Sequence, residues 1–261
     1  MRALAIMYHD VVENGDFTSS GFPGGGAHVY KLRREDFALH LDAIAAATSA
    51  VATVATVGSL TPRPVLLTFD DGGVSFLHPI ADLLEARNWR GHFFITTAQI
   101  GQPGFLSEAQ LRELHARGHI VGSHSRSHPT RMAALSRASL DSEWRDSLAR
   151  LTGILGDAVT VASVPGGYYS RAVGESAAAA GIQTLFTSEP TSRVAMLGNC
   201  RVLGRYVVQR GMAPSWSAGF ASGTPSQCWR QSALWTAKRV AKSLGGATYL
   251  RLRRAILERK P

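Results

Sequence analysis

Short apolar runs alternate with segments of helical spacing along most of this chain. The runs are rich in Val, Ile, Leu and Phe, are bounded by Gly, Pro or Asp, and predict buried strands at residues 4–8, 65–67, 91–95, 120–122, 159–164, 183–188 and 201–208. Between them, apolar residues recur every three or four positions and predict helices at residues 32–47, 76–86, 107–117, 140–155 and 171–180. This alternation predicts an α/β fold built on a mainly parallel sheet.

The predicted strand at 65–67 is followed by candidate catalytic residues. It continues as VLLTFDDGG and delivers two adjacent carboxylates, Asp70 and Asp71, followed by two glycines. Neighbouring residues at a strand end point to opposite sides of the chain, so one carboxylate can bind a metal while the other handles a proton. The alternative for this motif alone is an ordinary polar turn, because Asp and Gly are common turn residues.

A second polar cluster follows the predicted strand at 120–122. It contains His124 and His128, four positions apart. One Asp and two His hold a metal while leaving positions open for water and substrate, which is typical of a catalytic zinc site. A single His is more often a surface or hydrogen-bonded residue, but the two clusters together favour a metal site.

These motifs resemble those of a known family. TFDDG at 68–72 and HSRSH at 124–128 are similar to the first two motifs of the polysaccharide deacetylases, the NodB-like carbohydrate esterases. The resemblance extends from about residue 4 to residue 188 and implies a distorted (β/α) barrel. It also implies that Asp71, His124 and His128 hold a divalent metal, with Zn²⁺ expected, and that Asp70 is the general base. The implied substrate is an N-acetylated amino sugar in a glycan or its lipid-linked precursor.

The third family motif is altered in this chain. The family usually has an Arg, then a Pro, a Tyr and a Gly, and a backbone N–H after the Pro helps to hold the oxyanion. Here Ser163 stands where the Arg is expected, and PGGYY at 165–169 places Gly166 where the Tyr is expected. We expect Gly166, Gly167 and Tyr168 to line the oxyanion and substrate site; the alternative is a simple tight turn.

Because the Arg of the third motif is missing, another residue must orient the general base, Asp70. Arg126 and Arg205 are the two candidates to replace it. Arg205, on the last predicted strand, is also expected to contribute to oxyanion or substrate binding; the alternative is a solvated strand residue.

The general acid must also come from an unusual place, since no histidine follows His128. Family members usually carry a late catalytic His that protonates the leaving amine. Some have a permuted motif order, and MYHDV at 7–11 resembles the tyrosine-histidine-aspartate strand with which they start. His9 is therefore the expected acid, and a structural His at the strand end is the alternative. His28, in a glycine-rich segment at 15–30 predicted to be a mobile loop, is a weaker candidate.

Length and composition suit a single large domain with an appendage. The chain has 261 residues, of which 45% are hydrophobic and 18% charged, and no apolar run is long enough to span a bilayer. Cys200 and Cys228 have no metal or redox spacing. No secretory signal precedes the first predicted strand, so a cytoplasmic location is expected.

The net charge of +9 is concentrated at the C-terminal end, where residues 238–260 hold eight Lys or Arg and one acid. We therefore divide the chain into a deacetylase domain at 1–222 and a basic amphipathic helical tail at 223–261. Such a tail favours peripheral contact with the anionic inner face of a membrane. The alternative is a terminal helix packed on the barrel with a solvated basic face. Nucleic acid is not expected, because no known binding module is present.

Two other functions remain open from the sequence. One is a metal-dependent amidase that acts on a non-carbohydrate amide through the same site. The other is a catalytically weak glycan-binding protein, suggested by the missing Arg and the missing late His. The presence of Asp70, which a binding protein would not need, favours an enzyme.

Overall fold

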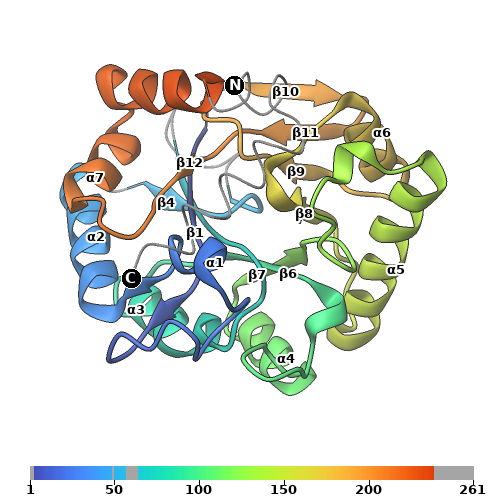
Figure 1. Ribbon diagram of the computed structural model, residues 1–261, viewed down its shortest axis with the longest axis horizontal. Coiled ribbons are helices and arrows are strands. Elements are labelled where there is room, and N and C mark those ends of the chain that lie inside the picture. The colour runs from blue at the N-terminus through green and yellow to red at the C-terminus, as the bar shows by residue number, and fades with distance from the viewer. Residues whose placement is uncertain (1–2, 49, 57–63, 238–261) are drawn as a thin grey trace.

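The computed structural model describes residues 3–48, 50–56 and 64–237, and its core is a curled parallel sheet surrounded by helices (Figure 1). In this described part the strands are β1 Leu4–Tyr8, β2 Val11–Val12, β3 Leu32–Arg33, β4 Val51–Ala52, β5 Val65–Phe69, β6 His92–Ile95, β7 Ile120–Ser123, β8 Val161–Ser163, β9 Thr184–Phe186, β10 Val194–Leu197, β11 Cys200–Leu203 and β12 Tyr206–Val207. The α-helices are α1 Gly25–His28, α2 Arg34–Ala47, α3 Asp82–Glu85, α4 Glu108–Ala116, α5 Arg137–Leu155, α6 Arg171–Ala179 and α7 Pro214–Ser222.

The main sheet has the order β10-β11-β9-β8-β7-β6-β5-β1-β12, with β4 beside β5, and a separate pair is formed by β2 and β3. All neighbours run parallel except β10 and β11, which form an antiparallel hairpin. Consecutive parallel strands joined by helices are the pattern of a (β/α) barrel. The predicted fold class, a distorted barrel of this type, is confirmed.

The strand predicted at 201–208 is in fact two strands, β11 next to one end of the sheet and β12 at the other end. β11 pairs with β9, whereas β12, only two residues later, pairs with β1. The interruption arises at Gly204 and Arg205, where the backbone of Glu189 approaches closely. The Arg205 N–H donates to the Glu189 carbonyl, and a Cβ on Gly204 would lie 2.1 Å from that oxygen. Residues 200–207 thus bridge the opening of the barrel.

Other elements also differ from the predictions, among them the short elements β2, β3, β4, α1 and α7, which were not predicted. The helix predicted at 76–86 is a 3₁₀ turn at Val74–Phe76, a π-helical turn at Leu77–Ala81 and then α3. Strand β10 was not predicted, because its residues are half-buried or exposed and form no buried run.

Side chains of alternate strand residues fill two layers, as the period of two requires. One set, including Ile6, Leu67 and Phe93, packs against the helices. The other set faces the barrel interior and consists of Ala3, Ala5, Ala52, Leu66, Phe94, Val161, Phe186 and Leu203. The barrel interior is therefore a packed core rather than a channel.

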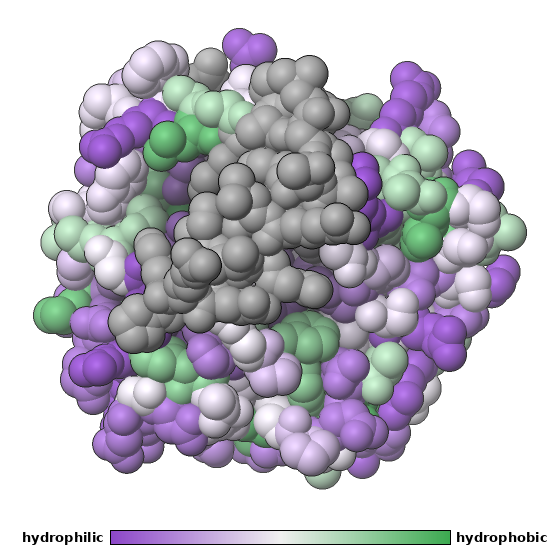
Figure 2. All heavy atoms as spheres, in the orientation of Figure 1, coloured by the Kyte–Doolittle hydropathy of each residue, from purple (hydrophilic) through white to green (hydrophobic). Residues whose placement is uncertain are grey.

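The helices present polar residues outward. Helices α2 and α7 lie together on one side of the barrel and α5 and α6 on the other (Figure 1). On the face shown in Figure 2, hydrophilic residues prevail along the lower and right edges, and smaller hydrophobic groups are scattered among them. This distribution is expected for helices that bury only their apolar stripe.

The described beginning of the predicted tail packs on the barrel. Residues 225–237 are helical, and the Gln231 side chain donates to the Val207 carbonyl at 2.8 Å and accepts from the Val207 N–H at 2.9 Å. This side chain therefore satisfies backbone groups of β12, which is an end strand of the sheet. The basic segment at 238–260, on which the predicted membrane contact rests, lies outside the described residues.

No helix in the described ranges combines the length and the apolar character needed to cross a bilayer.

Candidate active site

The loops that follow β5 and β7 bring together one carboxylate and two imidazoles. His124 Nε2 and His128 Nε2 each lie 3.5 Å from Asp71 Oδ1, and the three candidate ligand atoms are all within 4.8 Å of one another. Asp71 and His124 are buried, while the His128 side chain is 26% exposed. These three donors fit a divalent metal such as Zn²⁺, and the exposed side leaves room for further ligands.

Unusual backbone conformations hold these residues in place. Among the five non-glycine residues with positive φ in the described chain, three are Asp71 (90°), Ser125 (60°) and His128 (56°). Such conformations are unfavourable for residues with a Cβ and often occur at functional sites. Hydrogen bonds from Thr96 N to the Asp71 carbonyl and from Thr97 N to the Ser125 carbonyl tie both loops to the end of β6.

Asp70 turns to the other side and forms a bidentate ion pair with Arg205. Arg205 Nη1 donates to Asp70 Oδ1 at 2.6 Å, and Nη2 donates to Oδ2 at 2.7 Å. Both groups are buried, with exposures of 3% for Asp70 and 0% for Arg205. The guanidinium carbon lies 5.7 Å from the ring centre of Phe94 and 5.9 Å from that of Phe186, on the inner layer of the barrel.

This position differs from the expected role of Arg205 in oxyanion or substrate binding. Its other hydrogen bonds go to Thr68 Oγ1 and the Thr187 carbonyl, so the guanidinium is enclosed by the barrel and is directed at Asp70. Of the two candidates to replace the missing motif Arg, Arg205 is therefore the one that orients the carboxylate; Arg126 is exposed. An enclosed bidentate pair fixes the plane of the Asp70 carboxyl group.

Ser163, which stands where the family's Arg is expected, connects the two halves of the site. Its Oγ donates to Asp70 Oδ1 at 3.1 Å and lies 2.6 Å from His124 Nδ1. Because Ser163 Oγ donates its only proton to Asp70 Oδ1, it accepts the hydrogen bond from His124 Nδ1–H. In the neutral imidazole, this arrangement leaves His124 Nε2 without a proton and available to a metal. In the protonated imidazole, which is the form that acts on the pKa values of Asp70 and Asp71, Nε2 carries a proton.

The local charges keep both carboxylates ionised. Burial raises the pKa of Asp70, but the charges of Arg205 and His124 and the hydrogen bonds from Arg205 outweigh it and hold the pKa below its usual value. Burial likewise opposes ionisation of Asp71, yet the hydrogen bond with His124 and the charges of His9 and His128 hold its pKa well below normal. Burial lowers the pKa of His128, as does the charge of His124, and this favours the neutral imidazole that binds metals.

The PGG turn packs beside the loop that carries the two His residues. Gly166 (φ 66°) and Gly167 (φ 71°) both adopt the left-handed conformation that favours glycine. A Cβ at Gly166 would lie 3.1 Å from the Thr130 carbonyl, so a side chain there would require a small shift of one of the two loops. The Tyr168 ring lies 5.6 Å from the guanidinium of Arg131. Gly166 and Tyr168 thus lie beside the His loop, whereas Gly167 faces Ser188.

His9, at the end of β1, is close enough to the two carboxylates for its charge to lower the pKa of both. Its ring stacks on Tyr30 with ring centres 4.6 Å apart, and its Nδ1 is buried with no hydrogen-bond partner in the described chain. The weaker candidate, His28, is the last residue of α1. Burial lowers the pKa of His28, and so do the charges of Lys31 and Arg210. Of the two candidates, only His9 contributes to the charge at the carboxylate pair.

The barrel and this acid-histidine cluster define a class of protein, the (β/α) barrels with a candidate metal site at the carboxyl ends of their strands. Within that class, the profile of the family described as polysaccharide deacetylase matches residues 58–185. This part of the chain belongs to the polysaccharide deacetylase family.

Individual relatives support this membership. A chitin deacetylase of Pestalotiopsis sp is 32% identical over 120 residues, which cover 46% of this chain and 39% of that protein. The first three curated relatives are matched over 34% to 54% of their own length. Among solved structures, IcaB from Ammonifex degensii has a TM-score of 0.68 at 23% identity and covers 85% of this chain and 97% of that one. The deacetylase PplD of Streptococcus pyogenes, solved with acetate, has a TM-score of 0.68 at 19% identity and covers 82% and 95%. These two structures share the fold.

Proposed function

We propose that this protein is a metal-dependent hydrolase that removes N-acetyl groups from N-acetylated amino sugars in a polysaccharide or its lipid-linked precursor. The observation that carries the proposal is the pair of adjacent carboxylates whose nearest partners differ, although His124 Nε2 also lies 4.0 Å from Asp70 Oδ2. Asp71 faces His124 and His128, while Asp70 is held by Arg205. This separation gives one carboxylate to a metal and the other to a proton. Family membership, with a chitin deacetylase among the relatives, supports the substrate class.

Asp71, His124 and His128 would hold the metal, with Zn²⁺ expected from the nitrogen-rich donor set. When bound, the metal would lower the pKa of a coordinated water towards about 7 and polarise the amide carbonyl. Asp70, ionised and fixed by Arg205, accepts the proton of the attacking water. The backbone N–H groups at Gly166 and Gly167, with Tyr168 beside them, stabilise the developing oxyanion. His9 protonates the leaving sugar amine, and acetate is released.

The role of His9 gives a prediction. We expect His9→Ala to lower acetate release about a hundredfold, the low end for a positioned proton donor, because water would then have to protonate the amine. His28→Ala is the matched control, since His28 has a lowered pKa but no place at the carboxylate pair. Acetate release would be measured on an N-acetylglucosamine pentamer with Zn²⁺. Loss of activity in His28→Ala alone would transfer the acid role to that residue.

A substrate panel tests the proposed substrate class. The protein should release acetate from N-acetylglucosamine oligomers faster than from N-acetylated peptides of similar size. Preference for the peptides would favour the amidase alternative. Binding of an oligomer that remains intact in the presence of Zn²⁺ would favour a glycan-binding protein.

The proposal also covers domain organisation and location. We assign residues 1–222 to the deacetylase domain and 223–261 to a basic tail, and we place the protein in the cytoplasm at the inner membrane face. The eight Lys or Arg at 238–260 support this placement. The protein should sediment with phosphatidylglycerol vesicles at low salt, less at high salt, and not with phosphatidylcholine vesicles. Equal recovery in the supernatant with both lipids would contradict the membrane contact.

A further inference from the structure

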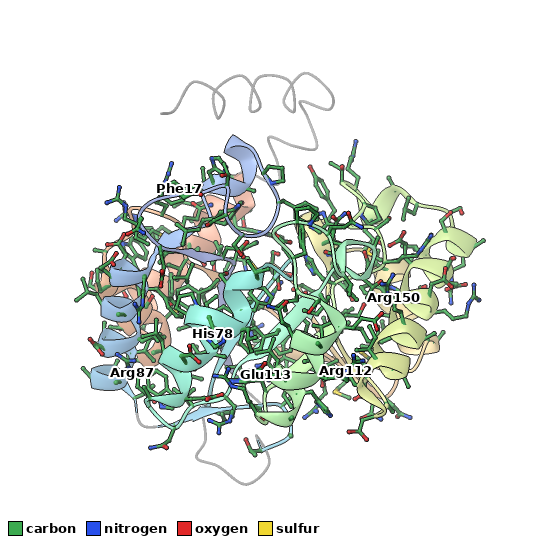
Figure 3. The ribbon with its side chains drawn as sticks, turned by 90° about the horizontal axis from the view of Figure 1, so that it is seen from below. Phe17, His78, Arg87, Arg112, Glu113 and Arg150 are labelled. Atoms are coloured by element: carbon green, nitrogen blue, oxygen red, sulfur yellow. The ribbon has the colours of Figure 1, made fainter. Side chains whose placement is uncertain are left out.

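The segment between β2 and β3, residues 13–31, covers one side of the candidate site, and we call it the β2–β3 loop. It contains α1 and lies at one end of the barrel, where Phe17 marks it in Figure 3. The Phe22 ring lies 5.1 Å from the ring of His128 and 5.0 Å from that of Phe105. Tyr30 stacks on His9 at 4.6 Å. The loop therefore contacts both a candidate metal ligand and the proposed acid.

The loop was predicted to be mobile because of its glycines, but a buried polar cluster fastens it to the barrel. Asp10, which follows His9 and is 1% exposed, accepts hydrogen bonds from Ser20 Oγ at 2.6 Å and Ser75 Oγ at 2.8 Å. Ser20 belongs to the loop, and Ser75 lies just after the DDGG motif. Ser20 Oγ in turn accepts from Ser75 N at 3.0 Å. One carboxylate thus joins the loop to the segment that carries the catalytic carboxylates.

A buried lysine completes the cluster. Lys31, at the end of the loop, is 1% exposed, and its Nζ donates to the carbonyls of Phe17 and Ser20. Burial lowers the pKa of Lys31, and the nearby negative charge of Asp10 opposes that change. Buried charges of this kind are costly unless they are paired and hydrogen-bonded. Disruption of the cluster should therefore loosen the loop, which is also held by hydrogen bonds from Gly21 N to the Gly104 carbonyl and from Arg210 N to the Val29 carbonyl.

Two glycines make room for the Asp10 carboxylate. A Cβ on Gly73 would lie 1.8 Å from Asp10 Oδ1, and one on Gly21 would lie 2.0 Å from Oδ2. The second glycine of the DDGG motif is thus required by the approach of Asp10 to the turn. In contrast, a Cβ on Gly26, an exposed residue in the same loop, would have no atom within 4 Å.

We propose that Asp10 is a positioning residue, which holds the β2–β3 loop so that Phe22 packs on His128 and Tyr30 on His9 while the loop forms one wall of the substrate site. The inference rests on the proposed deacetylase function. It assigns no proton transfer to Asp10.

The variants Asp10→Ala and Gly73→Ala should have the same effect, one by removing the carboxylate and the other by displacing it. We expect both to lower kcat/KM for the N-acetylglucosamine pentamer about a hundredfold, the scale of a misplaced substrate-positioning element, mainly through a higher KM. A partly unfolded sample would lower kcat alone, because its folded molecules would bind substrate normally. Asp10→Asn, which keeps an acceptor oxygen for Ser20 and Ser75, should recover most of the loss, and Gly26→Ala should behave as the native protein.

Two further measurements, the rate of proteolysis and the Zn²⁺ affinity, do not depend on catalytic activity. Chymotrypsin should cleave the loop after Phe17 or Tyr30 faster in Asp10→Ala and Gly73→Ala than in the native protein, while Zn²⁺ affinity stays the same. A native rate of cleavage, or a native KM despite rapid cleavage, would overturn the proposal. If the native protein itself releases no acetate, the proposed function fails, and the chymotrypsin rates still decide whether Asp10 anchors the loop.

Discussion

Replacing Arg205 by Met should lower the free energy of unfolding by about 3–5 kcal/mol, the usual cost of leaving one buried charge without its partner. Arg205 is fully buried and forms both hydrogen bonds to the Asp70 carboxylate. Met fills a similar volume between Phe94 and Phe186 but provides no charge. The measurement is urea unfolding followed by circular dichroism.

The matched control is Arg137→Met. Arg137 is 53% exposed and pairs with Asp141 on the surface of α5, so its loss should change stability by at most about 1 kcal/mol. The double variant Arg205→Met with Asp70→Asn should recover part of the loss, because no ionised carboxylate is then left unpaired. An Arg205→Met protein as stable as Arg137→Met would contradict the buried ion pair.

The second large effect concerns catalysis. Asp70→Asn should lower acetate release by about 10²–10⁴-fold, the contribution typical of a general base, while Zn²⁺ binding is retained. Asn has nearly the same shape but cannot accept the proton of the attacking water. Acetate release and Zn²⁺ affinity would be measured on the same preparation.

Asp71→Asn is the comparison that separates the two carboxylates. Because Asp71 faces both His124 Nε2 and His128 Nε2, this variant should lose Zn²⁺ affinity and activity together. If Asp70→Asn also loses Zn²⁺, the division of roles between the two carboxylates is wrong.

Much of the barrel could be predicted from the sequence, because buried parallel strands appear as continuous apolar runs. The run at 65–67 led to β5, and the one at 120–122 led to β7. The prediction failed at 201–208, where polar and apolar residues partly alternate on both sides of Gly204 and Arg205. The break there is caused by the backbone of Glu189, a contact between distant residues that no local pattern contains.

One part of the candidate site could likewise be predicted from the sequence, and another part could not. The position of one Asp and two His after predicted strands favoured a shared metal, and the family resemblance implied that Asp71 is the ligand. The structure places Asp71, His124 and His128 together. The partner of Asp70 could only be narrowed to two arginines, since Arg205 lies 135 residues further along the chain and is brought to Asp70 only by the folding of the sheet.

Ser163 and Asp10 show what sequence reasoning missed. In the sequence, Ser163 was interpreted only as the absence of an Arg. In the structure it forms hydrogen bonds with both Asp70 and His124. Asp10 was not singled out, because a lone Asp after a strand gives no local sign of a buried cluster. The close approach of Gly73 to its carboxylate exists only in the folded chain.

The central claim is that a metal held by Asp71, His124 and His128 makes this chain a deacetylase. The most direct measurement is acetate release from an N-acetylglucosamine pentamer by chelator-treated protein during titration with Zn²⁺. We expect no release before addition, and a rise that saturates near one equivalent of Zn²⁺, the capacity of the three-residue site. His124→Ala is the control and should not respond. Saturable Zn²⁺ binding at this site without any acetate release, or release unaffected by the chelator, would contradict the account.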